Sequence, residues 1–258
     1  MKRIFAILCL LLLPSLALAT PPTQIDSNSG NEPANTTTHT VTLPTTVYSG
    51  ALLVCWMGFD GNPTITWDNS TAGTWSTAYV DTVTASSSNK LYVIAKVADG
   101  TEGAAALSIS TSASEQSVFR CASYQDWEGT LAGGLNIPAA ATGTSTTPNP
   151  PAATDSWGSV DRKTIAVYAA DGARTVSAYP STYTLNQFSD SSGGGAGVGL
   201  GSAGLNSTPG TSQDPGTFTI SASDQWAAAT ISIKGGSAGG PPASTCTRGG
   251  LSLLGVGC

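Results

Sequence analysis

Two acidic residues that flank a tryptophan are the candidates for acid–base chemistry in this sequence. Asp126 and Glu128 lie on either side of Trp127, directly after a strand-like segment. A pair of carboxylates beside an aromatic ring is an arrangement that glycoside hydrolysis can use. Residues i and i+2 share a face on a strand, whereas on a loop their separation does not follow from the sequence. We favour a solvated loop and keep a carbohydrate-active enzyme using these acids as an alternative.

Tryptophan is frequent for a chain with so little charge, with six residues in all. Three of them occupy strand positions and are expected in the core, namely Trp56, Trp67 and Trp226. The other three lie at strand edges or in loops, where a flat ring can stack on a sugar face. Trp75, Trp127 and Trp157, together with Asp126 and Glu128, are therefore the candidate ligand-binding residues.

Other chemistry is disfavoured by what the sequence lacks. The single histidine, His39, excludes multi-histidine metal sites and most histidine-based catalysis. The pattern G-x-G-x-x-G at 199–204 and the pattern G-x-S-x-G at 235–239 both need a following helix, and turn-forming or proline residues follow instead. We interpret 199–204 as a glycine-rich strand that allows close backbone approach. We expect no catalytic residue, no metal site and no cofactor.

Composition and charge also bear on partners. Only 10% of the residues are charged, and glycine is abundant with 30 residues. Removal of Lys2 and Arg3 with a leader leaves eight of the ten basic residues against sixteen acidic ones, a net charge of −8. Such a surface repels phosphate backbones, so we expect no nucleic-acid partner.

Residues 1–19 are typical of a secretory signal peptide. A basic start precedes the apolar run Ile4–Leu13, and the small residues Ala17 and Ala19 follow. The run is too short for a good membrane span, so we expect cleavage before Thr20 and no transmembrane anchor. The predicted location is secreted, periplasmic or at the cell surface.

Four cysteines remain after the leader. Cys55 and Cys121 lie in strand-like segments, whereas Cys246 and Cys258 lie in a glycine-rich tail. An oxidising compartment permits a disulfide between Cys55 and Cys121. Two separate buried thiols are the alternative, because free cysteine packs well in cores.

Two pairs of similar segments predict an internal repeat. Residues 112–117 (SASEQS) resemble residues 221–226 (SASDQW), which lie 109 positions later. Asp60-Gly61 and Asp171-Gly172 each follow an apolar run and lie 111 positions apart. On these offsets Cys55 corresponds to a position near Ala166, and Cys121 to one near Thr230. Both cysteines of the first half are therefore replaced by small residues in the second half.

Short alternating segments separated by turn residues predict an all-β chain. The expected strands are 37–43, 51–59, 63–67, 75–84, 90–98, 104–111, 116–125, 163–170, 174–178, 182–188, 196–203, 216–222 and 225–234. The predicted fold is an antiparallel β-sandwich, jelly-roll-like, built from two related halves of about 110 residues. Two separate sandwiches are the alternative.

Composition divides the chain further. We expect a signal peptide at 1–19, a flexible N-terminal segment at 20–36, a β-sandwich at 37–234 and a Gly/Pro-rich tail at 235–258. Within the sandwich, the expected repeat halves are 37–128 and 157–234, joined by a linker at 129–156.

Over roughly residues 40–234 the chain resembles a loosely defined group of β-sandwich proteins of environmental bacteria and bacteriophages. The segments that carry the resemblance are Gly50–Val54, Asp60-Gly61, Gly73–Trp75, Val97–Gly103 and Ser112–Gln116. The resemblance implies surface or virion structure, attachment or glycan contact, and it offers no catalytic residues.

The sequence therefore predicts a secreted, non-catalytic β-sandwich protein for surface attachment or glycan binding. A phage virion or host-attachment component is one alternative, and a carbohydrate-active enzyme is the other. The expected partner is a glycan or cell-surface ligand, and the oligomeric state does not follow from the sequence.

Overall fold

The computed structural model describes residues 20–67, 73–76, 79–83, 88–191, 197–210 and 212–236. The predicted signal peptide at 1–19 and nearly all of the predicted tail at 235–258 lie outside these residues. In the described part the chain is almost entirely β, and its one helix is the four-residue α3 (Leu131–Gly134).

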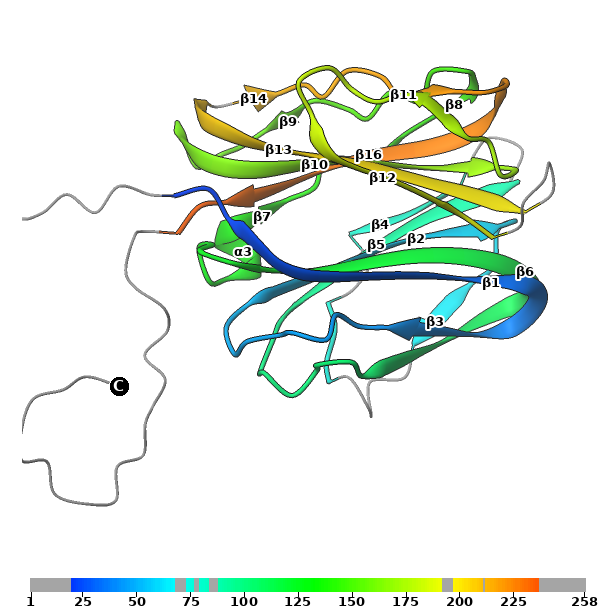
Figure 1. Cartoon of the computed structure of the whole chain (residues 1–258), viewed down its shortest axis with the longest axis horizontal. Helices are drawn as coiled ribbons and strands as arrows, with labels where there is room; N and C mark the ends of the chain where they lie inside the picture. Colours follow the sequence, from blue (N-terminus) through cyan, green and yellow to red (C-terminus); the bar gives the residue numbers. More distant parts are fainter. Residues whose placement is uncertain are drawn as a thin grey trace, which may run out of the picture.

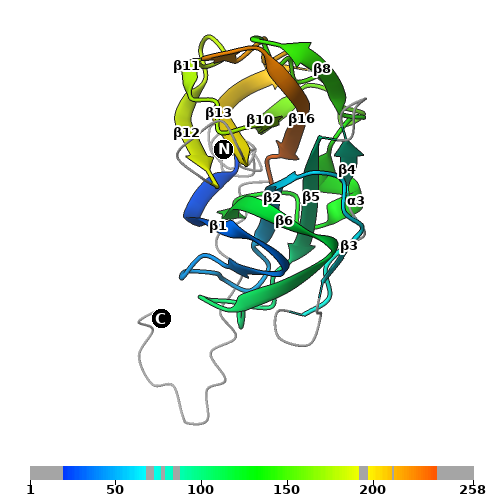
Figure 2. The ribbon, with the colours of Figure 1, turned by 90° about the vertical axis from the view of Figure 1, so that its right-hand side faces the viewer.

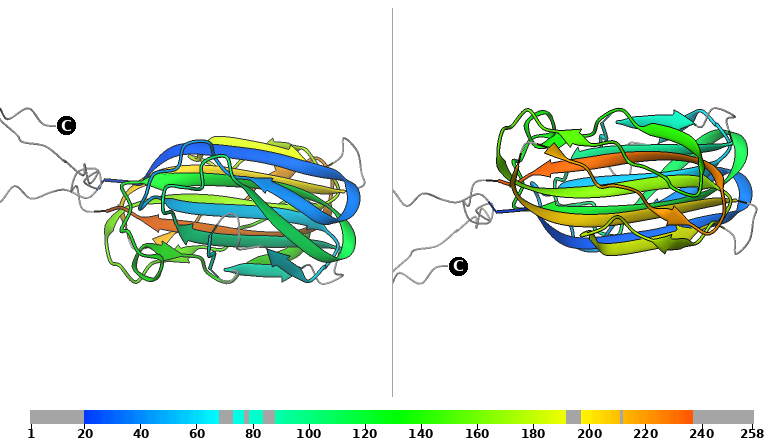
Figure 3. Two further views of the ribbon diagram at one scale, coloured as in Figure 1. Left: turned by 90° about the horizontal axis from the view of Figure 1, so that it is seen from below. Right: turned by 90° about the horizontal axis from the view of Figure 1, so that it is seen from above.

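Two antiparallel sheets stack face to face (Figures 1 and 3). The first sheet has the order β1-β6-β2-β5-β4, and β3 pairs with β6. Its strands are β1 (Thr23–Thr42), β2 (Leu52–Asp60), β3 (Ile65–Trp67), β4 (Val80–Val83), β5 (Asn89–Val97) and β6 (Ala106–Gln125).

The second sheet has the order β12-β13-β10-β16-β7, and β8 pairs with β16. Its strands are β7 (Leu135–Asn136), β8 (Ala141–Ser145), β10 (Val160–Asp171), β12 (Thr184–Asp190), β13 (Val198–Gly210) and β16 (Asp224–Lys234). Two short pairs lie outside the large sheets, β11 (Val176–Ala178) with β15 (Thr219–Ile220) and β9 (Ala153–Thr154) with β14 (Ser212–Gln213). The expectation of an antiparallel β-sandwich is confirmed.

The central strands β2 and β10 are apolar on both faces because each face meets a core. Leu52 and Val54 of β2 pack with Ile165 and Val167 of β10 in the core between the sheets. The alternate residues of β2 lie in a second core on the outer face of the first sheet, and those of β10 lie in a third core beyond the second sheet. Strands buried on both faces form nearly continuous apolar runs, as these two do.

β1 and β6 form a long pair that bends over the outer face of the first sheet (Figure 1). Their register runs from Thr23 opposite Gln125 to Thr42 opposite Ala106, with irregularities between Glu32 and Thr38. β6 therefore replaces the two strands expected at 104–111 and 116–125. The expectation of a flexible segment at 20–36 is wrong, since residues 23–36 belong to β1. This polar stretch shows no alternation, and its strand conformation comes from backbone pairing with β6.

The segment expected as a linker, 129–156, carries secondary structure of its own. It contains α3, β7, β8 and β9, and both β7 and β8 pair with β16. Like the first part of β1, these edge strands have few apolar residues and are held by main-chain hydrogen bonds.

The two sheets share an arrangement of four strands. The order β4-β5-β2-β6 in the first sheet corresponds to β12-β13-β10-β16 in the second. Cys55 lies opposite Cys121 in the first sheet, and Ala166 lies opposite Thr230 in the second. The offsets found in the sequence thus connect residues at matching register positions. Descent of both halves from one duplicated unit stays a prediction.

Each large sheet draws its strands from one continuous segment of the chain. Consecutive strands of a jelly roll alternate between its two sheets, so the likeness to a jelly roll lies in the layers and not in the strand order.

Candidate functional site

Trp75 and Trp127 do not present open ring faces, which corrects their prediction as stacking residues. Trp75 is 4% exposed in the outer core of the first sheet, and Trp127 is 7% exposed in the core between the sheets. Trp127 Nε1 also donates a hydrogen bond of 2.9 Å to the carbonyl oxygen of Gly50. Both rings pack inside a core, so neither has a face free to stack on a sugar.

The remaining predicted residues are Trp157, Asp126 and Glu128. Trp157 is partly buried in the turn before β10. Asp126 is exposed with φ of 59°, and Glu128 is exposed and forms an ion pair of 2.7 Å with Lys234 Nζ. The 126–128 segment fastens the C-terminal end of β16, because the amide of Gly236 donates 2.8 Å to the carbonyl oxygen of Asp126. A ligand role for Trp157, Asp126 and Glu128 stays a prediction.

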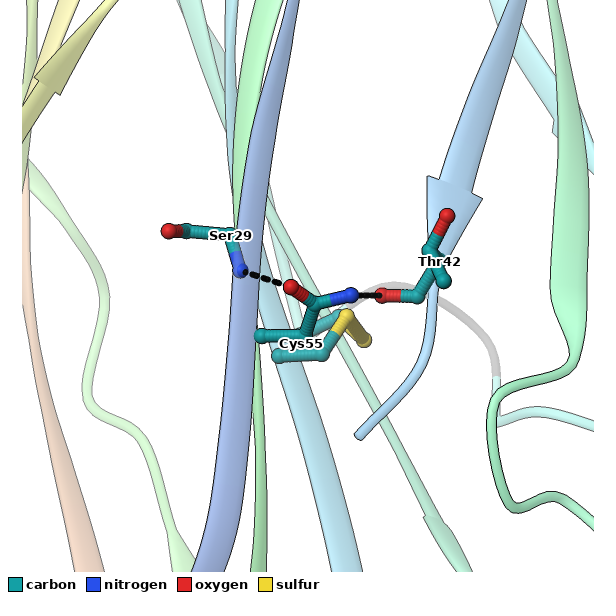
Figure 4. Close-up of a disulfide and its surroundings, with 5 residues drawn as sticks. Ser29, Thr42 and Cys55 are labelled. Atoms are coloured by element: carbon teal, nitrogen blue, oxygen red, sulfur yellow. Dashed lines mark hydrogen bonds between the residues drawn. A yellow bond between two sulfur atoms is a disulfide. The ribbon is translucent and has the colours of Figure 1, made fainter. Parts of the chain in front are cut away.

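The disulfide between Cys55 and Cys121 is present, so the bridged alternative is confirmed. Both cysteines are fully buried, and their Cα atoms are 4.1 Å apart on neighbouring strands. Figure 4 shows the disulfide beside a polar bridge between two parts of β1. In this bridge the side chain of Asn28 accepts 2.9 Å from the Ser29 amide and donates 3.1 Å to the Thr42 carbonyl oxygen. The disulfide has a structural role in the outer core.

His39 forms a serine–histidine pair that substrate cannot reach. Its Nδ1 lies 2.8 Å from Ser117 Oγ, and its Nε2 lies 3.1 Å from Thr111 Oγ1. His39 and Ser117 are 1% and 4% exposed, and burial lowers the pKa of His39. The group fills a polar gap in the core and offers no open nucleophile.

Carboxylates gather where β2 and β10 end. Burial raises the pKa of Asp60, and burial with the nearby charges of Asp224 and Asp60 raises the pKa of Asp171. Arg174 pairs with Asp224 at 2.6 Å. Among the described residues no group of three or more histidine, cysteine, aspartate or glutamate side chains is arranged to hold a metal ion.

A hollow lies at the seam between the two sheets and is the clearest candidate site. Figure 2 shows β1 and β12 along the same side of the molecule, and strands adjoining this seam line the hollow. Its walls include Gln24, Trp56, Arg120, Tyr124, Lys163 and Leu185. The enclosed part has room for about one water-sized group and opens to solvent.

The polar lining of the hollow consists mainly of hydrogen-bond donors. Arg120 donates from Nη1 to Gln187 Oε1 at 3.2 Å and from Nη2 to Ser27 Oγ at 2.9 Å. Lys163 Nζ donates 2.9 Å to Asn206 Oδ1 and lies 5.9 Å from the centre of the Tyr124 ring. Burial lowers the pKa of both cations. The site therefore combines positive charge with aromatic walls.

The sequence reasoning did not identify this site, although one signal was present. Arg120 lies between Val118 and Ala122, and Lys163 lies two residues before Ile165, all of which face the core between the sheets. A cation at an inward position of an otherwise apolar strand face is the pattern that could have revealed the hollow.

Comparison with protein-family models, with curated proteins and with solved structures finds no match to this chain. In the part of the chain that the structure describes, no helix is long and apolar enough to cross a membrane.

Proposed function

We propose that this protein is a secreted, non-catalytic binding module that attaches to a glycan through the hollow at the seam. The observation that carries the proposal is that the donors of Arg120 and Lys163 line a hollow that opens to solvent beside Leu185, which is 54% exposed. Binding sites for small ligands combine apolar surface with a few fixed polar groups. The hollow has both.

The scaffold suits this role because it holds the lining on strands and not on loops. Trp56 and Lys163 belong to the central strands β2 and β10, which are buried on both faces. Rigid strands keep binding groups in place without an ordering cost on binding. The signal-like leader and the disulfide support an extracellular location for such a module.

A glycan array probed with the full chain after leader removal tests the proposal. The test variant is Gly204→Val, which places a side chain in the lining of the hollow. A Cβ at Gly204 meets no atom nearer than 3.5 Å, so the fold has space for it. We expect the wild type to bind a defined set of glycans and the variant to lose at least tenfold in affinity. Ala139→Val, on an exposed loop residue, is the control.

Two results would count against the proposal. One is an array on which the wild type binds nothing, and the other is unchanged binding by Gly204→Val with the same melting temperature as the wild type. Circular dichroism of both variants shows whether each is folded before the array is interpreted.

A further inference from the structure

We propose that the hollow binds the carboxylate group of an acidic sugar, with Arg120 and Lys163 as its counter-charges. This inference rests on the proposed glycan-binding function and names the class of sugar that the site selects.

The first argument is a comparison of the cationic side chains. Five of the seven described lysines and arginines form ion pairs with carboxylates, as in Lys90–Asp81 at 2.6 Å and Lys96–Glu102 at 2.7 Å. Arg120 and Lys163 are the two with no carboxylate within 4 Å among the described residues, and both line the hollow. In a chain with sixteen acidic residues, this separation from acids is a feature of the site.

The second argument is the free energy of burial. Lys163 is buried, and Arg120 is partly buried. A buried cation without a counter-charge destabilises a fold, because neutral acceptors such as Asn206 and Gln187 replace only part of its lost hydration. An anion bound in the hollow would offset that cost, so the folded protein favours an anionic ligand here.

The third argument is an unpaired donor. Trp56 is 1% exposed, and its Nε1 has no hydrogen-bond partner among the described residues. An indole N–H can only donate, so it requires an acceptor. Trp56 lines the same hollow as the two cations, and a carboxylate supplies acceptor oxygens only.

Size selects the group that enters. The enclosed space holds about one water-sized group, which suits a carboxylate oxygen and excludes a sugar ring. The ring then lies at the mouth, where Leu185 is 54% exposed and offers an apolar surface. The carboxylate oxygen that enters accepts a charge-assisted hydrogen bond from Arg120, whose Nη1 and Nη2 also donate to Gln187 and Ser27.

The experiment measures binding of the full chain by isothermal titration calorimetry. The probes are polygalacturonate, alginate, hyaluronan and sialyllactose, each compared with its methyl ester, in which the carboxylate charge is removed. We expect binding to at least one acid form and at least tenfold weaker binding to the matching ester.

Lys163→Met is the test variant, and Lys234→Met is its control. Lys234 also lies on the second sheet but pairs with Glu128. Lys163→Met should weaken binding at least tenfold and raise the melting temperature of the free protein, because it removes an unpaired buried charge. Lys234→Met should leave binding unchanged. If Lys163→Met does not fold, Arg120→Gln takes its place with the same expected loss of binding.

The inference is overturned if none of the acid forms binds, if acid and ester bind equally, or if Lys163→Met binds as tightly as the wild type. Binding to neutral glycans that Gly204→Val abolishes would retain the proposed function while the carboxylate inference fails. If the protein binds no glycan at all, both the proposed function and the carboxylate inference are wrong.

Discussion

Cys55 and Cys121 lie directly opposite each other on β2 and β6, at the register position that Ala166 and Thr230 occupy on β10 and β16. All four side chains are fully buried. The same place in the two sheets is therefore bridged covalently in one and packed without a bridge in the other.

Removal of the bridge should destabilise the protein without changing its fold. The disulfide closes a loop with a sequence separation of 66 residues, which corresponds to about 4 kcal/mol of loop entropy. Cys55→Ala combined with Cys121→Ala should lower the free energy of unfolding by about that amount, as measured by urea denaturation. Equal urea midpoints for variant and wild type would contradict this.

A second disulfide should form at the matching position. Ala166→Cys with Thr230→Cys places two thiols on directly opposite residues, the geometry that Cys55 and Cys121 already use. Alkylation in urea before and after reduction should count two additional protected thiols. In the control, Ala166→Cys with Ala228→Cys, the second cysteine lies two residues from the opposite position, and both new thiols should remain free.

Strands whose side chains face a core are the ones whose ends the sequence predicted well. β2 and β16 were found close to their observed ends because apolar residues recur along them. The first part of β1 and the strands β7 and β8 were not found, since their conformation depends on hydrogen bonds to β6 and β16. Pairing with a distant strand leaves little trace in a polar segment.

The candidate site was missed for a related reason. Arg120 on β6 and Lys163 on β10 are brought together only when the two sheets stack. The sequence directed attention to tryptophans at apparent strand edges, and two of these, Trp75 and Trp127, pack into cores. Burial of an aromatic ring depends on the covering segments, which the sequence did not place.

Acidic residues at the ends of β2 and β10 should make stability fall as pH rises above their unfolded pKa values. Burial raises the pKa of Asp60 and of Asp171 in the folded state, so ionisation costs more there than in the unfolded chain. The penalty is absent below the unfolded pKa of about 4 and complete above the raised pKa. Asp60→Asn should therefore stabilise the protein at pH 7 and have little effect at pH 3.5, as measured by melting temperature.

Asp26 should show the opposite pH dependence to Asp60, because its pKa is lowered in the folded protein. Hydrogen bonds from the amides of Thr46 at 2.9 Å and Ser27 at 2.7 Å lower its pKa. Its contribution is present above the unfolded pKa and is lost as pH falls through the folded pKa. Asp26→Asn should destabilise the protein at pH 7 and converge with the wild type at low pH. If Asp60→Asn and Asp26→Asn change stability with pH in the same direction, the raised pKa of Asp60 and the lowered pKa of Asp26 cannot both be correct.

Glycine at position 201 should be required by the ring of Tyr168. The prediction of a glycine-rich strand with close backbone approach at 199–204 is confirmed, because a Cβ at Gly201 would overlap the ring carbons of Tyr168 on the neighbouring strand. Gly201→Ala should therefore destabilise the protein by about 1–3 kcal/mol through overpacking. Gly204→Ala is the control, since a Cβ there has ordinary contacts from 3.5 Å outward and alanine restricts the unfolded chain. In urea denaturation Gly201→Ala should unfold at a lower concentration than the wild type, and Gly204→Ala should unfold at an equal or higher one. Equal losses in both variants would mean that the strand tolerates no side chain on either residue and that the Tyr168 ring is not the cause.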